Sequence, residues 1–160
     1  MTKRITAIPT NYKGIRFRSK LEASWARFFD DITMRWTYEV EGYEFADGTR
    51  YLPDFWLPDC KTYFEVKGVF DEKSWNKIRQ LSNAASPKEI LVAIGESDVP
   101  FSLGLISGST IYRFSDTDIA VCSKCSKPYI LCLGEEWTCR NCGYYDGDAT
   151  FRTLILDDMI

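Results

Sequence analysis

Acidic and basic side chains lie close together in two apolar segments of the chain. Ten residues separate Pro53-Asp54 from Glu65-Val66-Lys67. Because side chains alternate across a strand, Glu65 and Lys67 are expected to point to the same face. A hairpin between the two segments would place Asp54 beside them. We therefore expect two carboxylates and a lysine to converge.

This set of side chains suits a hard divalent cation. Mg²⁺ and Mn²⁺ prefer oxygen ligands, and the carboxylates of Asp54 and Glu65 with the carbonyl of Val66 would supply three. Lys67 would then orient an attacking water or stabilise charge that develops on a phosphate. The alternative interpretation is structural, because an acid followed two positions later by a lysine is also typical of an ion pair on a strand.

The chain contains no histidine, which removes whole classes of chemistry. Ser-His-Asp and Cys-His nucleophile pairs and the HExxH zinc proteases all need an imidazole. Acid-base chemistry must therefore come from carboxylates, lysines, cysteines or tyrosines.

Four cysteines form a second candidate site. Cys122 and Cys125 make one CxxC pair, and Cys139 and Cys142 make another after 13 intervening residues. Paired thiolates at this spacing are typical of a tetrahedral Zn²⁺ site, and four protein ligands leave no position for a reacting water. We expect structural zinc, in a segment too short to fold on an apolar core alone. Such a module could bind nucleic acid, dock a protein partner or only support the fold.

Hydrophobic periodicity indicates the elements that position these residues. Ser19 begins one amphipathic helix as an N-cap, with Glu22 at the edge of its buried face. Pro87 ends a second helix. The order is helix, three strands, helix and strand, which indicates an α/β domain. The expected elements are a helix over 19–32, strands over 36–45, 51–57 and 62–67, a helix over 71–85, and strands over 89–94 and 111–114.

Length and charge set further limits. A chain of 160 residues allows one main domain with a small module. Residues 1–27 hold seven basic side chains and one acidic side chain. Residues 28–59 hold two basic and eight acidic side chains, and residues 60–88 hold six basic and three acidic ones. Basic stretches that flank an acidic one suit a polyanion, although solvated helix faces give the same pattern.

The chain has neither an N-terminal signal-peptide pattern nor a long apolar run, so we expect a cytoplasmic protein without a membrane partner.

Taken together, four segments resemble the PD-(D/E)xK nuclease superfamily, especially phage junction-resolving endonucleases and the endonuclease subunits of transposons. Arg18-Ser19-Lys20-Leu21-Glu22-Ala23 looks like the helix with the first acidic residue. Tyr51-Leu52-Pro53-Asp54-Phe55 looks like the PD strand, and Glu65-Val66-Lys67-Gly68 looks like the ExK strand. The basic helix after Gly68 takes the place of the second family helix.

The resemblance implies a restriction-endonuclease-like core over residues 1–118 and a zinc ribbon with a tail over residues 119–160. It implies Glu22, Asp54, Glu65 and Lys67 as catalytic residues, with Mg²⁺ or Mn²⁺ on the carboxylates. Glu39 or Glu41 is an alternative to Glu22, and in related resolvases the helical acid comes from a partner chain. The residues expected to contact DNA are Arg16, Arg18, Lys20, Lys73 and Lys77, for which a merely solubilising role is the alternative.

The implied function is a metal-dependent DNA endonuclease that prefers branched DNA such as a Holliday junction. The expected partners are DNA, a second copy of the chain, or a phage or transposition protein. The alternative is a catalytically silent or partner-dependent nuclease-fold module that binds DNA or recruits a protein.

Overall fold

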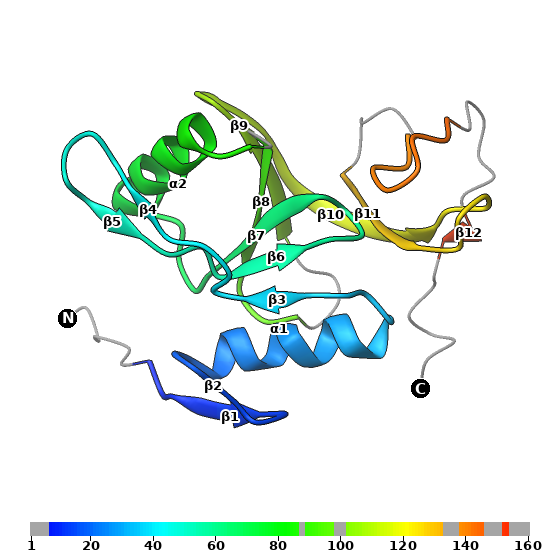
Figure 1. Cartoon of the computed structure of the whole chain (residues 1–160), viewed down its shortest axis with the longest axis horizontal. Coiled ribbons are helices and arrows are strands. Elements are labelled where there is room, and N and C mark those ends of the chain that lie inside the picture. The colour runs from blue at the N-terminus through cyan, green and yellow to red at the C-terminus, as the bar shows by residue number, and fades with distance from the viewer. Residues whose placement is uncertain (1–6, 87–88, 98–101, 133–137, 146–151, 154–160) are drawn as a thin grey trace.

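The computed structural model describes residues 7–86, 89–97, 102–132, 138–145 and 152–153. It is a mixed α/β structure with a core made mostly of sheet (Figure 1). Its described helices are α1 (Lys20–Asp31) and α2 (Glu72–Ala84). The described strands are β1 (Thr10–Tyr12), β2 (Ile15–Phe17), β3 (Thr37–Tyr38), β4 (Tyr43–Glu44), β5 (Arg50–Tyr51), β6 (Phe55–Leu57), β7 (Thr62–Lys67), β8 (Glu89–Ile94), β9 (Ser102–Ser107), β10 (Thr110–Val121), β11 (Pro128–Cys132) and β12 (Arg152–Thr153).

One large sheet organises the molecule. Its strands follow the order β11-β10-β9-β8-β7-β6-β3, and β12 pairs with β10. The pair β7 and β8 is parallel, and α2 makes the crossover between them. The other pairs in this sheet are antiparallel. Two separate hairpins, β1–β2 and β4–β5, lie outside it. No described helix has the length and apolarity needed to cross a membrane.

The two helices cover opposite faces of the sheet (Figure 1). Phe64 packs against Trp25 of α1, with ring centroids 4.9 Å apart. The preceding residue, Tyr63, belongs to the cluster that contains Ile78 of α2. Because side chains alternate along β7, Glu65 faces the same side as Tyr63. The α2 face of the sheet therefore carries the acidic residue of interest.

Both helices begin at a capping side chain, and the sequence predicts the first of these caps, Ser19. The Ser19 Oγ accepts a hydrogen bond from the Glu22 N–H at 3.1 Å and donates one to Glu22 Oε1 at 2.9 Å. Asp71 caps α2 by accepting from the Ser74 N–H at 2.8 Å. The predicted helices over 19–32 and 71–85 are confirmed, as are the strands over 62–67 and 89–94.

The expected strands over 36–45 and 51–57 are wrong as continuous elements, because each is divided into two short strands. Glu39 has a φ of +50°, which interrupts the first, and its N–H bonds to the Asp54 carbonyl at 3.0 Å. Pro53 interrupts the second, since it has no N–H for a ladder. The halves β3 and β6 join the main sheet, whereas β4 and β5 form an arm that ends in a turn at Asp47-Gly48.

Several elements have no clear signal in the sequence. The hairpin β1–β2 and strand β9 lie outside the predicted elements, and the strand expected over 111–114 is part of the longer β10. Strand β10 runs through residue 118, so the sheet continues across the predicted domain boundary. The division into 1–118 and 119–160 stays a prediction.

Candidate functional site

The predicted catalytic residues of β6 and β7 meet at one end of these strands. Phe55 pairs with Phe64, so Asp54 lies next to Glu65 just beyond the pairing. The Lys67 Nζ lies 2.7 Å from Glu65 Oε2 and 3.4 Å from Asp54 Oδ2. The structure thus brings Asp54, Glu65 and Lys67 together on the face that α2 covers, in the arrangement that strand alternation predicts.

Main-chain groups hold the two carboxylates in place. The Val66 N–H donates to Asp54 Oδ2 at 2.8 Å, and the Asp54 N–H donates to Glu65 Oε1 at 3.2 Å. The Tyr51 hydroxyl donates to Glu65 Oε2. Sequence reasoning did not single out Tyr51, and its only signal is its place two residues before Pro53. Both carboxylates are therefore fixed by groups on the neighbouring strand.

Burial shapes the electrostatics of this cluster. Glu65 is fully buried and Asp54 is 4% exposed. Burial raises the pKa of Glu65, the charge of Asp54 raises it further, and Lys67 offsets part of the shift. Burial lowers the pKa of Lys67, but the charges of Glu65 and Asp54 outweigh it, so this pKa lies above its ordinary value. Lys67 is therefore a cation that balances one of two neighbouring acids.

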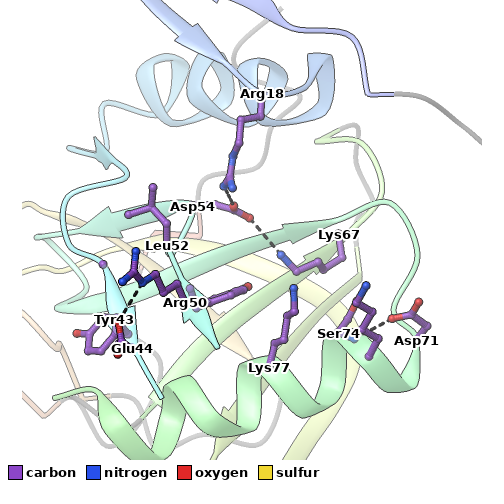
Figure 2. Close-up of a pocket in the computed structure, with 13 residues that line it drawn as sticks. Arg18, Tyr43, Glu44, Arg50, Leu52, Asp54, Lys67, Asp71, Ser74 and Lys77 are labelled. Carbon is purple, nitrogen blue, oxygen red and sulfur yellow. Dashed lines mark hydrogen bonds and ion pairs between the residues drawn. The ribbon is translucent and has the colours of Figure 1, made fainter. Parts of the chain in front are cut away.

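Arg18 reaches the same cluster from the start of α1. Its Nη2 lies 2.7 Å from Asp54 Oδ1, and its Nε lies 2.8 Å from Glu39 Oε1 and 3.8 Å from Glu22 Oε2. Figure 2 shows Asp54 between Arg18 and Lys67, with a cation on each side. The structure places Arg18, which the sequence suggested as a DNA contact, directly against the predicted metal ligand Asp54.

Both carboxylate oxygens of Glu22 already accept hydrogen bonds from neighbouring residues. Its Oε1 accepts from the Ser19 hydroxyl at 2.9 Å. Its Oε2 accepts from the Arg18 N–H at 3.2 Å and from the Tyr38 hydroxyl. Arg18 connects Glu22 with Asp54, and the role of Glu22 as a metal ligand stays a prediction.

A pocket of about 760 Å³ opens at the cluster. The β4–β5 arm forms one wall, and the first turns of α2 form another (Figure 2). Of the residues predicted to contact DNA, Arg18, Lys73 and Lys77 line this pocket, whereas Arg16 and Lys20 are exposed elsewhere, in β2 and at the start of α1. The pocket is thus lined by five cations and three acids, which are Arg18, Arg50, Lys67, Lys73, Lys77, Glu44, Asp54 and Asp71.

The four predicted cysteine ligands converge. All four Sγ atoms lie within 4.8 Å of one another, and both Cys122–Cys142 and Cys125–Cys139 are 3.7 Å apart. Zn²⁺ with four Zn–S bonds of about 2.3 Å at tetrahedral angles separates its sulfurs by about 3.8 Å. The cluster is therefore close enough to bind a metal ion and has the dimensions of a zinc site.

The local backbone explains this convergence. The Ser126 N–H donates to the Cys122 carbonyl at 2.8 Å, and the Gly143 N–H donates to the Cys139 carbonyl at 2.7 Å. Ser126 and Gly143 have positive φ values of 56° and 70°, so each pair makes the same tight turn four residues after its first cysteine. Two similar turns thus present their thiols to one point.

The pKa values of two thiols in the cluster shift in opposite directions, since burial raises the pKa of Cys139 to about 12. Burial raises the pKa of Cys125, but hydrogen bonds from the Asn141 side chain and the Lys127 main chain outweigh it and lower this pKa to about 6. The thiolate is the form that binds metals.

The cysteine module contacts the turn between β6 and β7. The Lys61 Nζ donates to the Asn141 carbonyl at 3.1 Å, and Lys127 lies 3.9 Å from Asp59. Asp59 has a fully buried side chain, and Arg35 donates to it from Nε, Nη2 and its main-chain N–H at 2.7–3.0 Å. One carboxylate therefore ties the β6–β7 turn to the preceding loop and to the module.

We expect Asp59→Asn to lower the free energy of unfolding by about 1–2 kcal/mol at pH 7, since it loses charge-assisted hydrogen bonds to the half-exposed Arg35. Burial raises the pKa of Asp59, but the bonds from Arg35 outweigh it and hold this pKa below its usual value. The stabilisation is therefore present above about pH 4 and is lost as pH falls through the folded-state pKa. Urea unfolding at pH 7 and pH 3 checks this.

The control is Asp31→Asn, which removes an exposed carboxylate at the end of α1. It should change the free energy of unfolding by less than about 0.5 kcal/mol. An Asp59→Asn loss that is the same at both pH values would contradict the charge-based explanation.

Comparison of the chain with protein-family models, with curated proteins and with solved structures finds no match in any of the three. The molecule is a mixed α/β protein with a mostly sheet core and four cysteines placed to bind a metal ion. Its function must be argued from the geometry of its sites.

Proposed function

We propose that the chain is a metal-dependent DNA endonuclease of the PD-(D/E)xK type. The observation that carries the proposal is the meeting of Asp54, Glu65 and Lys67 beside a pocket, which Asp54 and Lys67 line together with the cations Arg18, Arg50, Lys73 and Lys77. Two buried acids with one lysine are a costly arrangement for stability alone, since buried charges lose hydration. Such arrangements are concentrated at functional sites.

The donor set fits a hard divalent cation. Asp54 and Glu65 supply carboxylate oxygens that main-chain bonds already hold in place. Continuing the β6–β7 register by two residues places Pro53 opposite Val66. The Val66 N–H and carbonyl point to the same side, and Pro53 has no N–H to donate to that carbonyl. This supports Val66 as the third oxygen ligand for Mg²⁺ or Mn²⁺.

The residues would divide the work of phosphodiester hydrolysis. When bound, a divalent ion supplies the charge that acidifies water and stabilises a phosphoryl oxygen. Lys67 would donate hydrogen bonds to the attacking water and keep it in line with the phosphorus. Lys73 and Lys77 would hold neighbouring phosphates without reading sequence. As in the superfamily that the chain resembles, the products would carry 5′-phosphate and 3′-hydroxyl ends.

The proposed substrate is DNA, with branched DNA such as a Holliday junction as the preferred form. The cationic walls support a polyanion in general, and the preference for a branch comes from the resemblance alone. A second copy of the chain, or a phage or transposition protein, is the proposed further partner.

We also propose that the four cysteines bind structural zinc. The 3.7 Å sulfur separations support Zn²⁺, and four thiolates leave no open position for a substrate. The contacts of Lys61 and Lys127 with the β6–β7 turn support a role in holding the module against the sheet.

One observation favours a second candidate, a silent or partner-dependent module. Arg18 and Lys67 already balance Asp54 and Glu65, so the cluster is a complete ion-pair network in the free chain. A module of this kind would bind DNA but cut only with a partner, or never.

Cleavage of a matched panel of single-stranded, duplex and four-way-junction DNA tests the proposal, with Mg²⁺, Mn²⁺ or EDTA. We expect metal-dependent cutting by the wild type and a loss of at least about 100-fold in Asp54→Asn, which keeps the side-chain shape but removes the charge. Binding of the panel without cutting by a folded, zinc-loaded wild type would favour the second candidate. Cutting that persists in EDTA would contradict the metal-dependent mechanism.

A further inference from the structure

Three acidic side chains gather around the guanidinium of Arg18. Nη2 contacts Asp54 at 2.7 Å, and Nε contacts Glu39 at 2.8 Å and Glu22 at 3.8 Å. Proteins bind a cation by placing several carboxylates around one point. We propose that Arg18 is the resident cation of this position, so that the nuclease site takes one divalent ion and not two. The inference rests on the proposed function.

The two sides of Asp54 support this assignment. Its Oδ1 accepts from Arg18, whereas its Oδ2 accepts from the Val66 N–H and lies near Lys67. In two-metal sites, a pair of ions about 3.5–4 Å apart stabilises the attacking and leaving oxygens. Here the guanidinium fills the Glu22 side of Asp54, and the Glu65 side, where Lys67 lies 3.4 Å from Asp54, would hold the one ion of the proposed function.

Arg18 is held firmly in this position. The Tyr38 hydroxyl accepts from the Arg18 main-chain N–H at 3.2 Å and lies 3.4 Å from its Nε. The same hydroxyl donates to Glu22, whose two oxygens are both engaged by residues 18, 19 and 38. A second ion would have to displace Arg18 and break this set of bonds. An arginine stays charged at any physiological pH, so its place is filled whether or not a metal is bound.

The position also brings Arg18 to the substrate. Its side chain is 52% exposed and lines the pocket. Its contacts within the described residues engage Nε and Nη2, and the guanidinium has donors beyond these. Arg18 can therefore donate to a phosphate oxygen in the pocket while it balances Asp54.

Mn²⁺ binding to the zinc-loaded full chain tests the inference, measured by isothermal titration and by electron paramagnetic resonance of the free ion. We expect about one Mn²⁺ per chain in the wild type, lost in Asp54→Asn, and about two in Arg18→Ala, in which the three acids are unmasked. Arg18→Lys keeps the charge and should bind about one. Arg27→Ala removes an exposed cation elsewhere on α1 and should match the wild type. Arg18→Gln, closer in shape, replaces Arg18→Ala if the latter does not fold.

The outcomes separate the two proposals. About two Mn²⁺ in the wild type, or about one in both Arg18→Ala and Arg18→Gln, would overturn the role of Arg18 and leave the nuclease proposal standing. No Mn²⁺ in the wild type, or binding that Asp54→Asn does not change, would overturn both. As a second readout, the wild-type cleavage rate should rise with Mn²⁺ with a Hill coefficient of about one.

Discussion

Lys67→Ala is expected to reduce DNA cleavage by about 10²–10⁴-fold, the range for loss of a positioned proton-handling or charge-stabilising group. The ammonium of Lys67 lies 2.7 Å from Glu65 at the pocket floor, where it can reach a water that attacks a bound phosphate. The variant should keep its fold, because Lys67 ends β7 and lies outside both apolar clusters, but it should lose some stability, because its ammonium balances the buried Glu65. Single-turnover cleavage at saturating Mg²⁺, together with circular dichroism, measures both effects.

The matched control is Lys61→Ala, at the opposite end of β7. Lys61 contacts the Asn141 carbonyl and lies outside the pocket, so this variant should cut at the wild-type rate. Wild-type cutting by a folded Lys67→Ala protein would refute the mechanism. Equal losses in both lysine variants would show a general effect of charge on DNA affinity.

Cys139→Ser is expected to abolish binding of the proposed zinc ion and to destabilise the cysteine module by several kcal/mol. Cys139 is 1% exposed and lies 3.7 Å from Cys125 in the centre of the cluster. A structural zinc ion contributes its binding free energy to folding, so losing one of four thiolates removes much of that stabilisation. Metal analysis by mass spectrometry and thermal unfolding with and without a chelator provide the test.

Cys60→Ser is the control for this change, since it replaces a buried thiol outside the cluster. It should lose some stability as a core substitution and keep its zinc content. Equal zinc content in Cys139→Ser and the wild type would contradict the assignment of the cluster.

Local signals in the sequence are sufficient for the two helices, for β7 and for the cysteine turns. Ser19 and Asp71 cap helices because their side chains accept main-chain bonds within one turn, and this information lies within four residues. The alternation that unites Glu65 and Lys67 is likewise local. The CxxC spacing predicts the cysteine cluster for the same reason, since each turn needs only its own residues.

Contacts between distant segments are what the sequence does not reveal. Arg18 and Asp54 are separated by 36 positions, and no pattern in either segment indicates that they pair. The division of the expected strands depends on Glu39 in the left-handed region and on its bond to the Asp54 carbonyl. A non-glycine residue in that conformation is not predictable from residue type, so the separation of the β4–β5 arm from the main sheet was missed.

The β6–β7 hairpin connects the carboxylate cluster with the cysteine cluster. Its turn is fastened to the cysteine module through Asp59 and Lys61, and its open end holds Asp54 and Glu65. Strand β7 has six residues and is about 20 Å long at about 3.3 Å per residue. Loss of the whole cysteine module would free this turn, whereas Lys61→Ala removes a single exposed contact and leaves Asp59 bound to Arg35. Carboxylates need placement to within about 0.5 Å to act together. For the proposed nuclease, metal binding at the cysteines would therefore support the placement of the distant carboxylates. Removal of zinc is then expected to lower the cleavage rate before the sheet unfolds.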